Sequence, residues 1–328
     1  MNKKPAEIDA VITWVDGSDP VHKEKRMKYG DKNIFNSDDV AGSTRFSSLG
    51  EIFYCVASLN CFAPWLHKIY IITDEQDPML LPFLEKHFSD SHIPVAIVDH
   101  KVIFQGYEEY LPVFNSIAIE TMTWRIPGLS EYYIELNDDF ILSSPVKPED
   151  FFLPNGKLVC YAKWYSMQWT KLTRMLKPAK SGRKQVTFKG SMYNAASIAG
   201  RDFTFLKLLH TPRALRKSVY EKFFSEHPDL MTDNISHRFR HADQFTAQEL
   251  QYLLLMKESL LEVSKDVDEV HFFLQPKSKK RYVQKKIHTL SRMNNCKFCC
   301  FNSLDKASEE DRKLITDWIE SRLGLCMS

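Results

Sequence analysis

The sequence predicts an α/β protein built on a Rossmann-like, mainly parallel sheet. Through the first half of the chain, short apolar runs alternate with amphipathic stretches, which is the pattern of βαβ units. Polar clusters follow the apolar runs, as expected at the carboxyl ends of such strands. The 328 residues are 44% hydrophobic and 26% charged, which is ordinary globular composition and allows a substantial core.

Four strands and three helices are expected in this half, in alternating order. The strands are at 8–15, 68–73, 93–98 and 132–136, and the helices are at 45–62, 78–88 and 112–124. The first helix has the clearest signal, because its apolar residues from Phe46 to Leu59 recur at helical spacing and Ala63 and Pro64 close it.

The alternation fades beyond residue 152, where the chain becomes basic and rich in aromatic residues. We interpret this region as an inserted basic, helical subdomain. Helical patterns return at 203–209, 214–224 and 244–256. The expected division is an N-terminal part of the α/β core at 1–152, the insertion at 153–200, and a helical C-terminal part that completes the site at 201–328.

The charge balance and the apolar stretches exclude two classes of protein. Lys and Arg total 44 against 42 for Asp and Glu, a formal net charge of +2, which argues against a dedicated nucleic-acid binder. The longest apolar stretches, such as 69–72 and 253–256, fall far short of the roughly 20 residues that span a bilayer. The N-terminus lacks the basic, apolar and cleavage regions of a secretory signal. We therefore expect a cytoplasmic protein with no transmembrane helix.

Polar clusters at the four strand ends predict a ligand site. They are Asp16-Gly17-Ser18-Asp19, Thr73-Asp74, Asp99-His100 and Asn137-Asp138-Asp139. One such cluster would be a routine turn. Because ligands of open α/β sheets bind beyond the carboxyl ends of the strands, four clusters in register favour a site.

Asp138 and Asp139 are the candidate metal ligands. Adjacent carboxylates preceded by Asn137 suit a divalent cation that bridges a diphosphate, and hard oxygen ligands favour Mg²⁺ or Mn²⁺. Taken alone, such a triplet is more often a turn or a surface feature.

The segment at 8–20 offers a second group of contacts. Gly17 would let the backbone approach a ligand, Ser18 and exposed amides could meet a phosphate or a nucleotide, and Trp14 could pack near a base. The alternative is a strand followed by an Asp-Gly turn, with Trp14 in the core.

Several long segments resemble the blocks that define the Stealth family. The first two blocks match ITWVDGSDP, RFSSLGEIFYCVASLNCFAPWLHKIYIITDEQDP, VDHKVIF and LPVFNSIAIETMTWRIPGLSEYYIELNDDF. The third runs from His210-Thr211-Pro212-Arg213 to Arg240-His241-Ala242-Asp243, and the fourth is recognisable only in part, at 300–305. Because the chain departs there from the family's Leu-Asn-Asp-like pattern, Asn302 and Asp305 are given no role.

The resemblance implies both a fold and an activity. The family includes bacterial capsule and exopolysaccharide sugar-phosphate transferases and the animal N-acetylglucosamine-1-phosphotransferase. It implies a core like that of a type A glycosyltransferase. It also implies transfer of a hexose 1-phosphate, for example N-acetylhexosamine 1-phosphate, from a nucleotide diphosphosugar to a glycan hydroxyl, with release of the nucleoside monophosphate.

The length and the missing signal and transmembrane segments favour a bacterial member of the family that acts in the cytoplasm. A lipid-linked glycan acceptor would hold it near the anionic inner face of the cell membrane. No nucleic-acid partner is expected, and the oligomeric state is left open.

By resemblance, the catalytic residues are Asp139, His210 and Arg240. Asp139 would act as metal ligand or base, and His210 as acid/base or phosphate ligand, because imidazole titrates near physiological pH. Arg240 would clamp a phosphate with its planar, permanently charged fork. The alternatives are a helix cap for His210 and a structural ion pair for Arg240.

The resemblance also suggests which residues bind the substrate. Asn137 belongs to this set, and Arg45 could reach a phosphate, although a surface role is the alternative for Arg45. The residues expected to border the nucleotide are Asp16, Gly17, Ser18 and Asp19, and those expected to bind the sugar from the start of their helix are Asn115, Ser116 and Glu120.

Seven cysteines do not suggest a disulfide framework in a protein of this size. Cys296, Cys299 and Cys300 could form a zinc site if His288 or another residue supplied a fourth ligand, but ordinary reduced cysteines are favoured. The basic stretch at 277–286 could rest on anionic lipid or an acidic glycan, or be a solvated face.

Two other functions remain open at this stage. A conventional glycosyltransferase would share the fold, donor and metal but attack the anomeric carbon and release the nucleoside diphosphate. A non-catalytic glycan- or nucleotide-binding protein would keep only the fold, and the presence of Asp138, Asp139, His210 and Arg240 counts against it.

Overall fold

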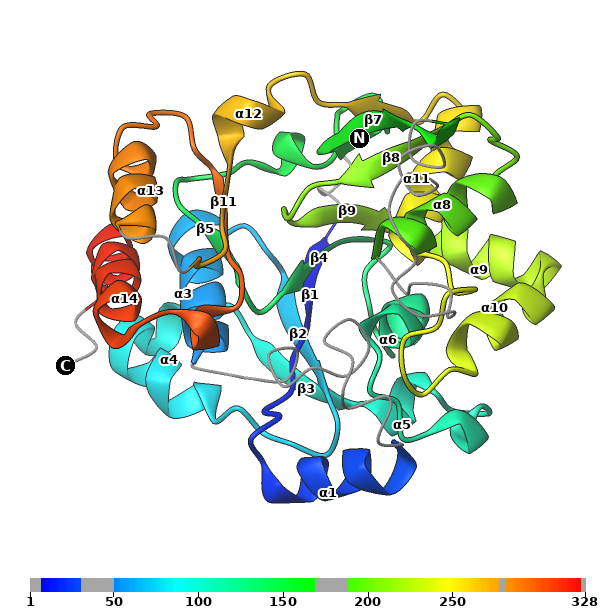
Figure 1. Cartoon of the computed structure of the whole chain (residues 1–328), viewed down its shortest axis with the longest axis horizontal. Coiled ribbons are helices and arrows are strands. Elements are labelled where there is room, and N and C mark those ends of the chain that lie inside the picture. The colour runs from blue at the N-terminus through cyan, green and yellow to red at the C-terminus, as the bar shows by residue number, and fades with distance from the viewer. Residues whose placement is uncertain (1–6, 31–49, 169–187, 278–280, 326–328) are drawn as a thin grey trace.

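The computed structural model describes residues 7–30, 50–168, 188–277 and 281–325. Its centre is a five-stranded sheet with the order β3-β2-β1-β4-β9 (Figure 1). The first four strands along the chain are parallel, and β9 joins β4 in the antiparallel sense. The predicted α/β class with a mainly parallel sheet is therefore confirmed. The strands are β1 (Ile8–Thr13), β2 (Lys68–Thr73), β3 (Val95–Asp99), β4 (Tyr132–Asn137) and β9 (Arg213–Arg216).

The central strands form where the sequence is apolar on both faces. β1 and β2 are buried along almost their whole length, as expected of parallel strands covered on both sides. Asp9 on β1 is the polar exception, at 0% exposed. Its carboxylate accepts a hydrogen bond from the Ser130 amide at 2.7 Å and contacts His67 Nδ1 at 2.8 Å, so the buried charge is satisfied.

Most helices of the first half contribute buried residues to the hydrophobic cluster that includes this sheet, and polar side chains cap some of them at the N-terminus. Asp19 caps the first helix by accepting from the His22 amide, and Asn115 caps α6 by accepting from the Ile117 amide. Arg45, in the first part of the helix expected at 45–62, lies outside the described residues. The helices are α1 (Pro20–Tyr29), α3 (Glu51–Phe62), α4 (Leu80–Phe88), α5 (His100–Ile103) and α6 (Ser116–Met122).

A second sheet brings the C-terminal part of the chain to the end of β4. Its order is β11-β12-β5, formed by β11 (His271–Leu274), β12 (Phe298–Phe301) and β5 (Phe140–Leu142). β5 follows β4 after a two-residue turn, and β12 pairs with it in the antiparallel sense. Helices α13 (Tyr282–Leu290) and α14 (Glu309–Leu323) lie on the same side of the molecule as α3 (Figure 1).

The middle of the chain is joined to the rest by strand pairing. Buried residues of β6 and α8 belong to the same hydrophobic cluster as those of β1 and β4. The three-part division of the chain stays a prediction. The paired strands are β6 (Leu158–Cys160) with β10 (Leu261–Val263) and β7 (Ala162–Ser166) with β8 (Thr204–Leu208), and the remaining helices are α8 (Phe188–Ile198), α9 (Lys217–Glu226), α10 (Pro228–Ile235), α11 (Ala247–Lys257) and α12 (Val267–Val270).

Two helices expected from local spacing are wrong in whole or in part. Residues 203–209 contain β8, which pairs residue by residue with β7. The helix expected at 214–224 begins as the edge strand β9, and α9 starts only at Lys217. In both cases a partner strand distant in sequence overrides a local helical pattern. Among the described helices, none is long and apolar enough to cross a membrane.

Candidate active site

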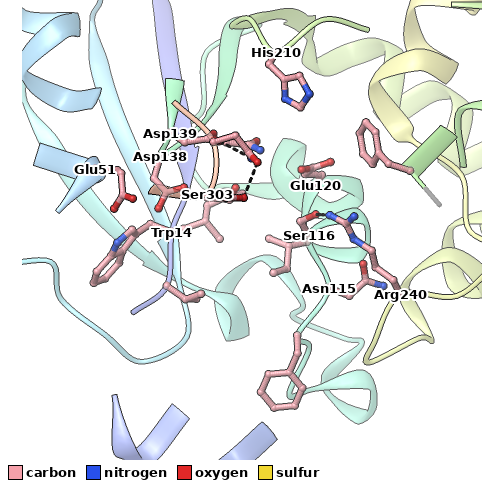
Figure 2. A pocket seen from close by; sticks show the side chains of 18 of the residues that line it. Trp14, Glu51, Asn115, Ser116, Glu120, Asp138, Asp139, His210, Arg240 and Ser303 are labelled. Atoms are coloured by element: carbon pink, nitrogen blue, oxygen red, sulfur yellow. Dashed lines mark hydrogen bonds between the residues drawn. The ribbon is translucent and has the colours of Figure 1, made fainter. Parts of the chain in front are cut away.

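A cavity of about 570 Å³ lies at the carboxyl edge of the central sheet (Figure 2). Residues that follow β1 and β4 line it, together with the first residues of α3 and α6 and with segments from the C-terminal half of the chain. The structure therefore has a cavity at the edge where the strand-end clusters predict a ligand site.

The acidic wall of this cavity consists of Glu51, Asp138 and Asp139. The two aspartates occupy the turn between β4 and β5, and Glu51 is the first residue of α3. Burial raises the pKa of Asp138 well above its ordinary value, and the neighbouring carboxylates of Asp139 and Glu51 raise it further. Burial also raises the pKa of Asp139, although a hydrogen bond from Asn302 opposes that rise. Like charges are thus gathered where a cation would relieve their repulsion.

Two buried oxygen atoms at the end of β4, one on Asn137 and one on Asp139, could serve a divalent cation. Asp139 Oδ2 accepts hydrogen bonds from Asn302 Nδ2 at 3.0 Å and Cys300 Sγ at 3.3 Å. Asp139 Oδ1 and Asn137 Oδ1 are buried and have no hydrogen-bond partner among the described residues. Among all the residues that the structure describes, no group of three or more His, Cys, Asp or Glu side chains is arranged to hold a metal ion. A cation bound to Asp138 and Asp139 would take further ligands from water and phosphate, as Mg²⁺ commonly does.

The basic wall lies across the cavity from the acidic wall. It includes Arg240 and the first residues of α6. Arg240 Nη2 donates to Ser116 Oγ at 2.9 Å, and its guanidinium carbon lies 5.6 Å from the Phe188 ring centroid. Figure 2 shows Arg240 and Ser116 on the side of the cavity opposite Asp138 and Asp139. The predicted phosphate clamp therefore faces the predicted metal ligands.

Asn115 and Glu120 line the same wall, but their polar atoms are engaged within the protein. Asn115 caps α6, and its Nδ2 donates to Gln244 Oε1 at 2.6 Å. Glu120 is 3% exposed, and its carboxylate accepts from Gln248 Nε2 at 2.9 Å. Both residues shape the wall, and sugar binding by them stays a prediction.

A buried ion pair stands behind Glu120. Arg213 Nη1 lies 3.3 Å from Glu135 Oε1, and Gln248 Nε2 donates to Glu135 as well as to Glu120. Burial, together with the charge of Glu120, raises the pKa of Glu135 to about 7, while Arg213 lowers it. No local pattern in the sequence predicts a role for Arg213, although it ends the His210-Thr211-Pro212-Arg213 motif.

His210 follows β8 and lies between the two walls (Figure 2). Its ring stacks on Phe273, with centroids 4.7 Å apart, and meets Phe140 edge-on at 6.2 Å. Burial, followed by the charge of Arg213, lowers the pKa of His210 to about 4. The imidazole is therefore neutral at neutral pH and can accept a proton. The alternative role as a cap of a preceding helix is excluded, because β8 is a strand.

The first loop, residues 16–19 after β1, does not line the cavity. Asp16 Oδ1 accepts from the Ser18 amide at 2.9 Å and from Ser18 Oγ at 2.6 Å, Asp19 caps α1, and the Gly17 carbonyl accepts from Arg26 Nη2 at 2.7 Å. These are the local contacts of a turn, the alternative that the sequence left open. Trp14 is 8% exposed and also lines the cavity, so it belongs to the core and to the site at once.

Several lining residues were missed by the sequence analysis or left without a role. Asn302, Ser303 and Asp305 reach the cavity from the segment after β12, and Glu51 from the start of α3. The partly recognised fourth block was the available signal for the first three. His100 also lines the cavity, at 2% exposed, and its Nδ1 has no hydrogen-bond partner in the described ranges.

The cysteines of the Cys-x-x-Cys-Cys motif do not point to one centre. Cys296 and Cys299 Sγ lie 3.7 Å apart, whereas Cys300 Sγ donates to Asp139 on the other face of β12. All three are free thiols. The motif therefore supports the acidic wall through Cys300 alone.

The fold and the cavity define an α/β protein with a charged ligand site at the carboxyl edge of its sheet. Two family models match the chain: Stealth protein CR1, conserved region 1, at residues 6–34, and Stealth protein CR2, conserved region 2, at residues 45–160. The exopolysaccharide phosphotransferase cps2G of Lactiplantibacillus plantarum is 33% identical over 271 residues, which cover 77% of this chain and 76% of that protein. The chain belongs to the Stealth family.

Other relatives are longer. The exopolysaccharide phosphotransferase SCO6023 of Streptomyces coelicolor is 35% identical over 71% of this chain but only 37% of its own length. The capsular polysaccharide phosphotransferase LcbA of Neisseria meningitidis is 32% identical over 72% of this chain and 61% of its own length. The chain thus spans from about a third to three quarters of the length of these curated relatives.

Two solved structures of glycosyltransferases are similar to the chain over most of its length, at low sequence identity. Mouse xyloside xylosyltransferase 1 has a TM-score of 0.42 and 11% identity, covering 91% of this chain and 98% of that chain. The galactosyltransferase LgtC has a TM-score of 0.41 and 9% identity, covering 98% of this chain and 97% of that chain.

Proposed function

We propose that this chain transfers a hexose 1-phosphate, such as N-acetylhexosamine 1-phosphate, from a nucleotide diphosphosugar to a hydroxyl of a growing cell-surface glycan. The observation that carries the proposal is the cavity in which Asp138 and Asp139 face Arg240, with His210 between them. The relatives support it, because they are named capsular or exopolysaccharide phosphotransferases.

The cavity offers separate environments for the parts of such a donor. Near the carboxyl ends of β1, β2 and β3 it is lined by Trp14, Ile72, His100 and Phe114, a largely apolar set that suits a nucleobase. Between the walls it offers cationic and acidic groups, which suit a diphosphate and its counter-ion. We therefore place the base beside Trp14 and the diphosphate between Asp138 and Arg240.

The assigned residues divide the work of phosphoryl transfer. A Mg²⁺ or Mn²⁺ ion, held by Asp138 and Asp139, would neutralise the diphosphate when bound. Arg240 pairs with phosphate oxygens and remains oriented by Ser116. His210, neutral in the free protein, accepts the proton of the acceptor hydroxyl on a ring nitrogen, and a nearby phosphate raises its basicity.

The bond that breaks distinguishes this reaction from conventional glycosyl transfer. The acceptor oxygen attacks the phosphorus that carries the sugar, and the bond between that phosphorus and the bridging oxygen breaks. The electron pair leaves with the nucleoside monophosphate, and the acceptor gains a phosphodiester.

Mass analysis of the products from a panel of nucleotide sugars and a glycan acceptor tests the proposal. We expect the nucleoside monophosphate and an acceptor heavier by a hexose and a phosphate. Release of the nucleoside diphosphate, with an acceptor heavier by the hexose alone, would establish a conventional glycosyltransferase. Saturable donor binding without turnover of any nucleotide sugar would favour a binding protein.

We place the reaction in the cytoplasm, where a lipid-linked acceptor would bring the chain to the inner face of the cell membrane. The electrostatic attraction of anionic lipid for basic segments supports this placement. Co-sedimentation with anionic vesicles, compared with neutral vesicles, tests it.

A further inference from the structure

Arg213 is a buried arginine whose capacity for hydrogen bonding is mostly unused. It is 5% exposed, belongs to β9 and lines the cavity. A guanidinium carries five N–H groups, and within the described part of the chain Arg213 makes one hydrogen bond, from Nη1 to Glu135 Oε1 at 3.3 Å. Its Nε is buried and has no partner there. Buried N–H groups are rarely left unpaired, so these donors point to a ligand that supplies acceptors.

The residues around Arg213 leave the edges of its guanidinium group available for such a ligand. The ring centroid of Phe140 lies 5.6 Å from the guanidinium carbon and covers one face. Glu135 takes part of one edge, and Gln248 fixes Glu135 and Glu120 by donating to both. Because the arginine lines the cavity, its remaining N–H groups can pair with an anion bound there.

The position of Arg213 places that anion close to the chemistry. Phe140 directly follows Asp139, and its ring contacts His210 as well as Arg213. Arg240, in contrast, is held on α6 by Ser116. The two guanidinium groups therefore come from different parts of the basic wall, β9 and the segment after α10, and can serve the two phosphates of one diphosphate.

We propose that Arg213 binds the transferred phosphoryl group and that Glu135 positions it. This rests on the proposed function and deepens it, because it assigns each phosphate of the donor its own arginine. As the acceptor oxygen bonds to phosphorus and the bridging bond breaks, the non-bridging oxygens gain charge, and hydrogen bonds from Arg213 stabilise it. Arg213 itself forms no covalent bond and gives up no proton.

Binding of inorganic pyrophosphate in the presence of Mg²⁺ tests the assignment without turnover. Arg213→Met alone leaves Glu135 unpaired and could unfold the chain, so the test uses Arg213→Met combined with Glu135→Gln, and Arg213→Lys. The matched control is Arg216→Lys, on the same strand. Arg216 Nε donates to Glu131 Oε1 at 2.7 Å and does not line the cavity.

We expect pyrophosphate to raise the unfolding temperature of the wild type and of Arg216→Lys. The double variant should bind it at least about tenfold more weakly, and its kcat should fall about 10²-fold with the acceptor KM little changed. Arg213→Lys should lose most of the rate, since an ammonium cannot replace a planar fork. Millimolar guanidinium should restore turnover to Arg213→Ala combined with Glu135→Gln and should leave the rate of Arg216→Lys unchanged.

Pyrophosphate affinity and kcat near wild-type values in the folded double variant would overturn the proposal. Its failure is distinguishable from failure of the proposed function. If the wild type released a nucleoside diphosphate, the reaction assignment would fall, while the pyrophosphate measurement would still decide whether Arg213 binds phosphate.

Discussion

The two walls of the cavity hold their charges in different ways. On the acidic wall, Asp138 and Asp139 are adjacent in sequence, burial raises the pKa of both, and Asp139 Oδ1 has no partner in the described part of the chain. On the basic wall, Arg240 is oriented by Ser116 and Arg213 by Glu135, residues far from them in sequence. The acidic wall thus keeps an oxygen atom without a partner in the described residues, whereas each arginine of the basic wall is oriented by another side chain. Changes in the first should therefore act on turnover, and changes in the second also on stability.

Removal of divalent metal should have the largest effect. Excess chelator should abolish transfer, and Mg²⁺ or Mn²⁺ should restore it, because the diphosphate would otherwise meet the carboxylates uncompensated. The measurement is product formation by mass analysis. Undiminished turnover in excess chelator would show that the acidic wall does not need a metal for transfer.

Asp139→Asn should lower the rate by roughly 10³-fold, since it removes charge at the place proposed for the metal and the phosphate. Asp16→Asn is the matched control, because that strand-end carboxylate contacts Ser18 and does not line the cavity. Initial rates and unfolding midpoints are measured for both. If Asp16→Asn lowers the rate as much as Asp139→Asn does, the first loop takes part in binding the nucleotide after all.

Arg240→Ala should cost roughly 10²-fold in kcat/KM for the donor, as expected for a lost charge-assisted phosphate contact. Ser116→Ala, which removes only the group that orients Arg240, should cost less. Equal losses of kcat/KM in the two variants would show that Ser116 contacts the substrate directly. An unchanged kcat/KM in both would show that Arg240 does not bind the phosphate.

The ion pair between Arg213 and Glu135 should be visible in stability. Glu135→Gln leaves a buried arginine without its carboxylate and should lower the free energy of unfolding by about 3 kcal/mol. Adding Arg213→Met should recover much of that loss. Additive losses in urea unfolding would mean that the two side chains do not interact.

His210, between the walls, should make stability depend on pH. Its folded pKa of about 4 lies below its ordinary 6.5. Between these values the unfolded chain binds more protons, so the stability contributed by the neutral imidazole is full above pH 6.5 and is lost as pH falls toward 4. The difference in unfolding free energy between wild type and His210→Gln should shrink over this range. A difference independent of pH would contradict the shift.

The smallest effect on turnover is expected for the cysteines behind the acidic wall. Cys299→Ser should lower stability but leave turnover near the wild-type rate, because Cys299 faces Cys296 and away from the cavity. Cys300→Ser should keep a donor to Asp139 and also remain active. Stoichiometric bound zinc, lost in either variant, would show that the thiols form a metal site.

Sequence patterns predicted the central strands well and the later ones poorly. β2 begins and ends where expected, because an apolar run buried on both faces is a strong local signal. β5 and β12 have three and four residues and no such signal. The local pattern at β8 predicts a helix, because its pairing with β7 is not visible in that pattern.

By itself, the sequence determined the parallel sheet and the edge at which polar residues gather, because period and strand-end composition are local properties. It also marked Asp138 and Asp139, which are neighbours in the chain. Only the tertiary structure decided which groups complete the site. Asn302 reaches Asp139 across 163 residues, and Glu135 reaches Arg213 across 78. Contacts over such separations depend on how sheets and helices pack, and no local pattern encodes them.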